Sequence, residues 1–283
     1  MSKVAIVADS TANLPPDLIE KLNITVVPLT LIWGEHTYLD NVDLTPEAFY
    51  TRLQKSKVSP TTSQPSPNLF LKAFSPLLDR GCDVLCITIS SKLSGTMQSA
   101  VQARDLIQQP DRVALLDSET ASTAAGFQVI AAARAAALGG DLLACKEAAV
   151  RARQNSSILF MVDNLEYLHR GGRINSAARF LGTAFNLKPL LEVRDGVIEA
   201  VERVRSPRKA LDRMLELTEQ RLRPCKTLHM TVLNAHAPEY HQYLKDQCLL
   251  RFKPDELIEG VVTPVIGTHT GPGTAGIGFH LEF

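Results

Sequence analysis

Short apolar runs alternate with amphipathic segments of helical period through the first half of the chain. Uninterrupted apolar runs bounded by turn residues predict buried strands, and a helical period behind a capping residue predicts a helix. The predicted strands are Val4–Ala8, Ile24–Trp33, Val84–Ile89 and Val113–Leu116. The predicted helices are Pro15–Leu22, Pro46–Ser56, Pro67–Arg80, Gly95–Gln108 and Ser122–Leu138. Strand–helix alternation favours a mainly parallel sheet with helices on both faces. We therefore expect a three-layer α/β domain over residues 1–155.

The pattern changes near Ser156. KPLLEVRDGVIEAVERVR reads as a hairpin, with a tight turn at Asp195-Gly196. The other predicted strands are Ile158–Val162, Thr227–Leu233 and the terminal GIGFHLEF, and the predicted helices are Ala177–Asn186, Pro207–Leu222 and Pro238–Arg251. Antiparallel pairing beside helices predicts a second, α+β domain with a mixed sheet over residues 156–283.

Composition narrows the class of protein. The 283 residues are 45% hydrophobic, enough for a large core, and 30 basic residues balance 30 acidic ones. Without a basic face, a nucleic-acid partner is not expected. Five scattered cysteines suggest reduced thiols rather than disulfides or a zinc site. The first residues lack a signal-peptide pattern, and Gln128 and Arg134 interrupt the most apolar helix, so we expect a cytoplasmic protein.

The segment VSPTTSQPSPNLF (58–70) concentrates hydroxyl groups in a stiff, uncharged stretch. Its three prolines restrict the backbone. Ser66 and Pro67 fit the cap and first residue of a helix. Thr61 and Thr62 either make turns or bind a ligand, and the sequence leaves both interpretations open.

Hydroxyl side chains also follow the strands of the first domain. Ligands collect beyond the carboxyl ends of parallel strands. The strand ends here supply Asp9, Ser10, Thr11, Ser90, Ser91, Ser94, Thr96, Asp117, Ser118 and Ser122. Ser94-Gly95 also begins a predicted helix, where free N–H groups favour an anion, although Ser94 could serve only as the N-cap.

Two further segments carry candidate chemistry. His269 lies in GTHTGPGTAG, where glycines allow the backbone to approach a ligand, or simply form a turn before the last strand. Arg170 and Arg173 flank two glycines in LEYLHRGGRI, as solvated arginines after a helix stop or as a phosphate or partner contact. Dinucleotide, P-loop, zinc-protease and nucleophile-elbow motifs are absent, and the histidines lack metal spacing.

Five motifs in order resemble the DegV family, the fatty-acid-binding subunits of bacterial fatty acid kinase. They are DSTANLP, PTTSQPSP, SSKLSGTMQSA, LEYLHRGGRI and GTHTGPGTAG, and the resemblance runs from Val4 to Phe283. Two positions depart from the family pattern: Met97 stands where tyrosine is common, and His169-Arg170 replaces a more usual lysine-rich pair.

The resemblance implies a two-domain α/β protein that holds one long-chain fatty acid, such as palmitate, stearate or oleate, in a tunnel between the domains. It implies a non-catalytic subunit without cofactor or metal. A separate ATP-binding kinase subunit would convert the bound acid to acyl phosphate for phospholipid synthesis, with transient exchange at the membrane surface. The carboxylate ligands carry over to Thr61, Thr62, Ser94 with the adjacent Gly95, and His269. Arg170 and Arg173 carry over as the surface that meets the kinase.

Physical chemistry agrees with this site, because uncharged donors can hold a buried carboxylate without a salt bridge that would compete with its phosphorylation. Two other classes of function remain open from the residues. One is a hydrolase with Ser94 as nucleophile, His269 as base and Asp9 or Asp117 orienting it. The other is a phosphate or sugar-phosphate binding protein.

Overall fold

The first domain is built on a four-stranded parallel sheet. The structure, a computed structural model, describes residues 3–180 and 187–283. The strands are β1 (Val4–Asp9), β2 (Thr25–Val27), β6 (Asp83–Thr88) and β7 (Val113–Asp117), in the order β2-β1-β6-β7. All three neighbouring pairs are parallel, as the strand–helix alternation predicts.

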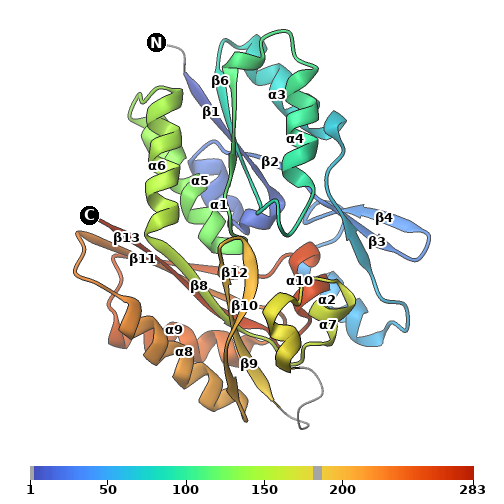
Figure 1. The fold of residues 1–283 in the computed structure, drawn as a ribbon, viewed down its shortest axis with the longest axis vertical. Coiled ribbons are helices and arrows are strands. Elements are labelled where there is room, and N and C mark those ends of the chain that lie inside the picture. The colour runs from blue at the N-terminus through green and yellow to red at the C-terminus, as the bar shows by residue number, and fades with distance from the viewer. Residues whose placement is uncertain (1–2, 181–186) are drawn as a thin grey trace.

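Helices cover both faces of this sheet (Figure 1). They are α3 (Pro67–Asp79) and α4 (Thr96–Asp105) on one face, and α5 (Ser122–Ala137) and α6 (Leu142–Gln154) on the other. Alternation along β1 explains the division, since Val4 and Ile6 pack in the core with α5 and α6. Ala5 and Val7 pack in the core with α3 and α4. The predicted three-layer arrangement is confirmed.

The second domain contains a six-stranded sheet in the order β10-β9-β8-β13-β11-β12. Its strands are β8 (Ser156–Met161), β9 (Lys188–Arg194), β10 (Val197–Val204), β11 (Thr227–Asn234), β12 (Glu256–Val261) and β13 (Ala275–Glu282). Only β11 and β12 pair in parallel, so the sheet is mixed, as predicted.

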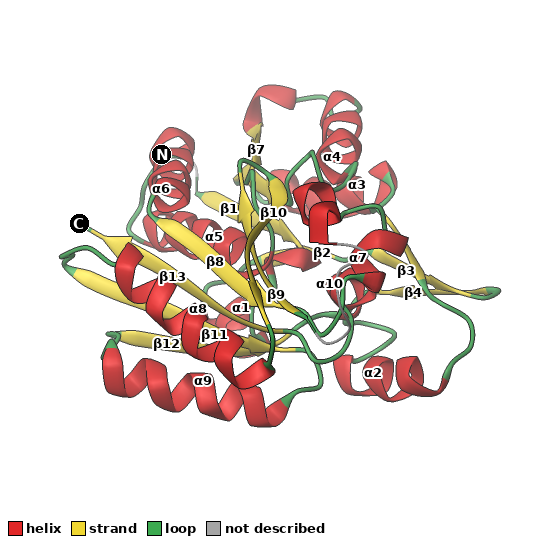
Figure 2. Ribbon diagram, turned by 60° about the horizontal axis from the view of Figure 1, so that its bottom comes forward, coloured by secondary structure: helices red, strands yellow, loops and turns green. Residues whose placement is uncertain are grey.

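The two faces of this second sheet have different neighbours (Figure 2). Helices α8 (Pro207–Arg221) and α9 (Pro238–Arg251) cover one face, and α5 of the first domain packs on the other. In β8, Leu159 and Met161 share a buried cluster with side chains of α8. Ile158 and Phe160 point to the opposite face and line a cavity.

Several short elements differ from the sequence-based expectations. The run Ile24–Trp33 divides between β2 and β3 (Thr30–Trp33), which belong to different sheets. The second of these sheets is small and antiparallel, in the order β4-β3-β5, and the Thr61–Ser63 segment of the proline-rich loop is its strand β5. The other short elements are α1 (Pro16–Lys21), α2 (Pro46–Lys55), β4 (His36–Leu39), α7 (Glu166–Arg170) and α10 (Pro264–Thr270). Helix α10 forms where a glycine-rich turn was one expectation.

Part of the helix expected at Ala177–Asn186 lies outside the described residues. The preceding segment Asn175–Phe180 is a 3-10 helix. Among the helices of residues 3–180 and 187–283, none has the length and apolar character needed to cross a bilayer. Within the same ranges, no three His, Cys, Asp or Glu side chains are grouped as metal ligands would be.

Candidate functional site

A cavity lies where the strand ends of the first domain face the second sheet. It consists of two chambers that share the wall residues Leu93, Ala121, Ile198, Ile266 and Thr270. The space between protein atoms is about 610 Å³ in one chamber and about 490 Å³ in the other. Both volumes include space that is open to solvent.

The first chamber, here called the polar chamber, collects hydrogen-bonding side chains from distant segments. Its polar lining residues, apart from the shared Thr270, are Thr11, Thr62, Ser63, Gln64, Ser94, Arg173 and His269. They come from β5, from loops after β1 and β6, from the segment after α7, and from α10. The chamber can therefore offer several hydrogen-bond donors to one acceptor group.

The second chamber, the apolar chamber, is lined almost entirely by hydrocarbon. Besides the shared residues it is lined by Ser122, Ile158, Phe160, Val193, Leu233, Val262, Thr274 and Gly276. Most belong to strands of the six-stranded sheet or to residues just beyond them. An alkyl chain placed here would lose water on nearly all sides.

Strand alternation decides which of the two neighbouring threonines reaches the cavity. Thr62 pairs with the fully buried Leu31, and Thr61 pairs with Ile32, which is 37% exposed. Side chains opposite one another share a face of the sheet. Thr62 therefore points inward and lines the polar chamber, and Thr61 is exposed and does not line it.

Helix α10 brings His269 against Thr62. The first turn of the helix is anchored by the first domain, because Asp40 accepts a 2.9 Å hydrogen bond from the Val265 N–H. Gly267 packs against the Tyr50 ring, where a Cβ would clash. At the other end of α10, Nε2 of His269 lies 2.8 Å from Oγ1 of Thr62.

His269 is uncharged at neutral pH. Burial, together with a smaller contribution from the positive charge of Arg173, lowers the pKa of its imidazole from 6.5 to about 4. The His269–Thr62 pair therefore presents a neutral hydrogen-bonding unit to the cavity.

Arg173 brings a positive charge to the polar chamber. Its Nε donates to the carbonyl of Leu93 at 3.1 Å, and its Nη1 donates to the carbonyl of Gly171. The sequence argument expected only uncharged donors around a carboxylate, whereas the wall of this chamber also contains Arg173. Arg170 lies apart on the surface, where it pairs with Glu166 and contacts Ser59.

The predicted helix Gly95–Gln108, with Ser94 as its possible N-cap, begins one residue too early. Gly95 is the N-cap of α4, and the hydroxyl of Ser94 lies 2.9 Å from that of Thr96. Ser94 lines the polar chamber, whereas Gly95 is exposed beside Gln64 and is not a lining residue. Ser66 caps α3 by position, but its side chain makes no capping hydrogen bond.

Most other strand-end polar groups support the backbone. Asp9 accepts hydrogen bonds from Thr11 and from the Ile89 N–H, and burial raises the pKa of its carboxyl. Asp117 accepts from the Ser91 and Glu119 N–H groups. The contacts of a Ser94–His269–Asp triad are therefore not formed, because neither aspartate hydrogen-bonds His269 and its Nε2 contacts Thr62.

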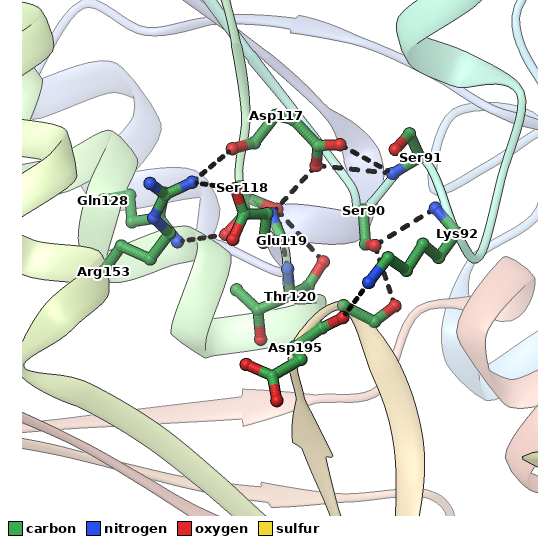
Figure 3. Close-up of polar contacts among 11 residues, drawn as sticks. Ser90, Ser91, Lys92, Asp117, Ser118, Glu119, Thr120, Gln128, Arg153 and Asp195 are labelled. Atoms are coloured by element: carbon green, nitrogen blue, oxygen red, sulfur yellow. Dashed lines mark hydrogen bonds and ion pairs between the residues drawn. The ribbon is translucent and has the colours of Figure 1, made fainter.

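A hairpin of the second domain closes one side of the cavity. Ile198 at the start of β10 lines both chambers. The adjoining turn docks on the first domain, since Ser90 Oγ donates to the Gly196 carbonyl and Lys92 Nζ donates to the Asp195 carbonyl, both at 2.8 Å (Figure 3). The cavity wall therefore depends on contacts between the two domains.

Sequence reasoning missed the lining roles of Ser63 and Gln64, and it assigned Arg173 to a partner surface. The polar segment VSPTTSQPSP did carry a signal for the first two residues. The apolar wall gave none, because its residues come from many separate strands, helices and loops. The departures Met97 and His169 do not line either chamber.

Comparison with known proteins decides the family. Residues 3–282 match the family profile described as "Uncharacterised protein, DegV family". The chain belongs to the DegV family. A DegV domain-containing protein of Halalkalibacterium halodurans is 34% identical over 283 residues, which is 100% of both chains.

Solved DegV structures share the whole fold. A DegV family protein from Thermus thermophilus, whose structure is described by its fatty acid binding, has a TM-score of 0.92 at 34% identity and 99% coverage of both chains. DegV of Bacillus subtilis, described as a fatty acid binding protein, has a TM-score of 0.89 at 30% identity and 100% coverage of both chains. A stearic-acid-binding protein from Eubacterium ventriosum has a TM-score of 0.89 at 26% identity, with 100% of this chain and 99% of that one covered.

Proposed function

We propose that this DegV protein binds one long-chain fatty acid and presents its carboxylate to a separate ATP-dependent kinase subunit, which forms acyl phosphate. The observation that carries the proposal is the junction of a polar chamber with an apolar chamber at the interface of the two domains. Fatty acid binding by the related Thermus and Bacillus proteins supports the same ligand class.

The two chambers suit the two ends of the ligand. Each buried methylene contributes about 0.8 kcal/mol, so the tail supplies most of the affinity. The carboxylate is ionised at neutral pH and needs donors once it leaves water. Thr62 and Ser94 offer hydroxyl donors, and Arg173 offers a compensating charge.

The binding step is tested by extraction and mass spectrometry of the protein purified from a bacterial host. A stoichiometric amount of long-chain fatty acid is expected. A lipid-free preparation that also fails to bind palmitate or oleate in calorimetry would sink the proposal.

The two neighbouring threonines provide a matched test of the carboxylate contacts. Thr62→Val and Ser94→Ala should each weaken fatty acid binding roughly ten- to hundredfold, because a hydrogen bond to a charged group is worth about 1.5–3 kcal/mol. Thr61→Val reports whether the exposed threonine joins the site. Its geometry predicts parent-like binding, and a loss equal to that of Thr62→Val would show that our assignment of the inward hydroxyl is mistaken.

Presentation to a kinase is tested at the surface arginine. Arg170→Glu reverses an exposed charge outside the cavity, so it should spare fatty acid binding and reduce acyl phosphate formation with a cognate kinase. Arg208→Glu, on the outer helix α8, is the control for reversing an exposed arginine. Equal rates of acyl phosphate formation with Arg170→Glu and Arg208→Glu would show that Arg170 is not part of the surface that binds the kinase.

Arg173 lines the polar chamber, so substitutions of Arg173 should affect fatty acid binding as well. Acquisition of the ligand at a membrane surface remains part of this proposal.

A further inference from the structure

Gly171 lies directly against the imidazole ring of His269. A Cβ at this position would lie 2.9 Å from Cε1 of the ring and still closer to Nδ1. Real Cβ contacts are essentially never this short. Gly171 has ordinary right-handed backbone angles, with φ −75° and ψ −10°. The backbone therefore does not require glycine here, and the requirement comes from the histidine ring.

The same contact leaves one ring nitrogen without a hydrogen-bond partner. Nδ1 of His269 is buried and has no partner among the described residues. A carbon placed on Gly171 would already overlap Nδ1, so no water fits between Gly171 and the ring. Nε2, on the opposite side, lies 2.8 Å from Oγ1 of Thr62.

The hydrogen-bond partners of the two ring nitrogens favour one neutral tautomer of His269. A neutral imidazole has one N–H donor and one bare acceptor nitrogen. A proton on Nδ1 would be a buried donor without an acceptor, and orphaned buried N–H groups carry a desolvation penalty. A proton on Nε2 is satisfied by the Thr62 oxygen. Thr62 then accepts from His269, and its own hydroxyl hydrogen is free to point into the polar chamber.

We propose that Gly171 is a positioning residue for the ligand carboxylate: by presenting no side chain to His269, it holds the ring in the Nε2–H tautomer and so makes Thr62 a donor toward the chamber. The inference rests on the proposed fatty acid site and adds a residue that touches neither ligand nor cavity. It also joins the segment between Arg170 and Arg173 to the carboxylate-binding group through one direct contact.

The tautomer is tested first, and without ligand. Long-range proton–nitrogen NMR spectra of the full chain with ¹⁵N-labelled histidine distinguish the protonated ring nitrogen, and His269→Gln assigns the signals. We expect a protonated Nε2 and a bare Nδ1 near neutral pH. A proton on Nδ1 would overturn the proposal. This measurement stands even if the parent protein binds no fatty acid, a result that would sink the proposed function and the carboxylate role of Gly171 but not the assignment of the tautomer.

Two adjacent glycines supply the matched variants. Gly171→Ala introduces a clash with His269 and no backbone strain. Gly172→Ala introduces strain at φ +70°, with no atom within 4 Å of the new Cβ. The readout is the ratio of affinities for palmitate and for hexadecanol, which has the same tail and no carboxylate. Gly171→Ala should lower this ratio about tenfold or more, the loss of one hydrogen bond to a charged group, and Gly172→Ala should keep the parent ratio. An unchanged ratio in Gly171→Ala, or an equal fall in both variants, would contradict the proposal.

A double variant covers the case in which Gly171→Ala does not fold. His269→Ala removes the ring that Gly171→Ala would displace. The double variant should therefore fold even where Gly171→Ala alone does not, and its affinity ratio should equal that of His269→Ala alone. A further fall in the ratio of the double variant would assign Gly171 a separate structural role and overturn the inference.

Discussion

His269 illustrates how burial sets the behaviour of single side chains in this protein. Its imidazole stays neutral because the cavity wall excludes water and Arg173 adds a positive charge nearby. Asp40, which anchors the helix that carries His269, shows the converse effect: burial raises the pKa of its carboxyl to about 6. At neutral pH His269 is therefore uncharged, whereas Asp40 is still mostly ionised and becomes protonated at a higher pH than an exposed aspartate.

The lowered pKa of His269 predicts a pH-dependent contribution to stability. The unfolded histidine binds a proton near pH 6.5 and the folded one near pH 4. Between these values the unfolded chain holds more protons, so this contribution to the free energy of unfolding is present above pH 6.5 and is lost as pH falls toward 4. His269→Gln should remove it. The measurement is urea unfolding of parent and variant at intervals between pH 4 and pH 7.

The difference between the two proteins isolates His269, because Asp40 contributes the opposite slope over part of this range in both of them. His36→Gln, at an exposed position on β4, controls for removal of a histidine. A difference between parent and His269→Gln that is constant with pH would show that folding does not lower the pKa of the His269 ring.

At the scale of elements, the β9–β10 hairpin shows a turn that serves two purposes. Asp195 and Gly196 have φ values of 51° and 79°, which suit the tight hairpin turn expected from an Asp-Gly pair. The same turn is a docking point for the first domain, and a Cβ on Gly196 would lie 2.5 Å from Oγ of Ser90. The glycine thus satisfies the turn and the domain contact together.

A comparison of two turn glycines separates these purposes. Gly196→Ala and Gly34→Ala both place alanine at a positive φ, but only the first meets another domain, since nothing lies within 4 Å of a Cβ on Gly34. Strain at such positions costs about 1–3 kcal/mol. Gly196→Ala should lower the free energy of unfolding by more than Gly34→Ala in denaturant titrations. Equal losses would mean that the hairpin tip adds nothing to stability through its contact with Ser90.

The elements that the sequence predicts well are those whose periodicity is strong. The strands β1, β6 and β7, the Asp195-Gly196 hairpin and the helix Pro207–Arg221 have clear apolar patterns or turn signals. Helix α10 lacks such a signal, because seven residues that are nearly all buried show no amphipathic period. Strand β5 is hidden for a different reason: Thr61–Ser63 contains no apolar residue, and its pairing partner β3 lies thirty residues earlier.

The residues of the site also fall into those that the sequence predicts and those that it does not predict. Ser94 and Thr11 could be predicted near a ligand because strand ends of a parallel sheet meet at one edge. The inward position of Thr62 could not, because it depends on pairing with Leu31. Arg173 carries no local signal that places its side chain in the cavity wall rather than on the surface.

At the scale of the whole molecule, the cavity occupies part of the hydrophobic interface between the two domains. Polar contacts also join the domains, including the hairpin tip on Ser90 and, away from the cavity, an ion pair of 2.8 Å between Arg134 of α5 and Glu256 of β12. The second is half-exposed and contributes about 0–1 kcal/mol. Apolar contact across the cavity is therefore a substantial part of what can hold the domains together.

A fatty acid in the apolar chamber should stabilise the folded protein. Binding to the folded state alone adds about 2.7 kcal/mol when free ligand is a hundredfold above the dissociation constant. Thermal unfolding should therefore shift upward with palmitate and less with a short-chain acid such as butyrate, which cannot fill the chamber. The same rise with both acids would place the stabilising contact at the carboxylate alone.

The apolar chamber has a consequence for the lifetime of the protein in a cell. Under the proposed function, a bound lipid fills part of the hydrophobic core, so a molecule without lipid should open more often and be cut more readily by proteases. Abundance of this carrier would then follow the supply of fatty acids without any dedicated regulator.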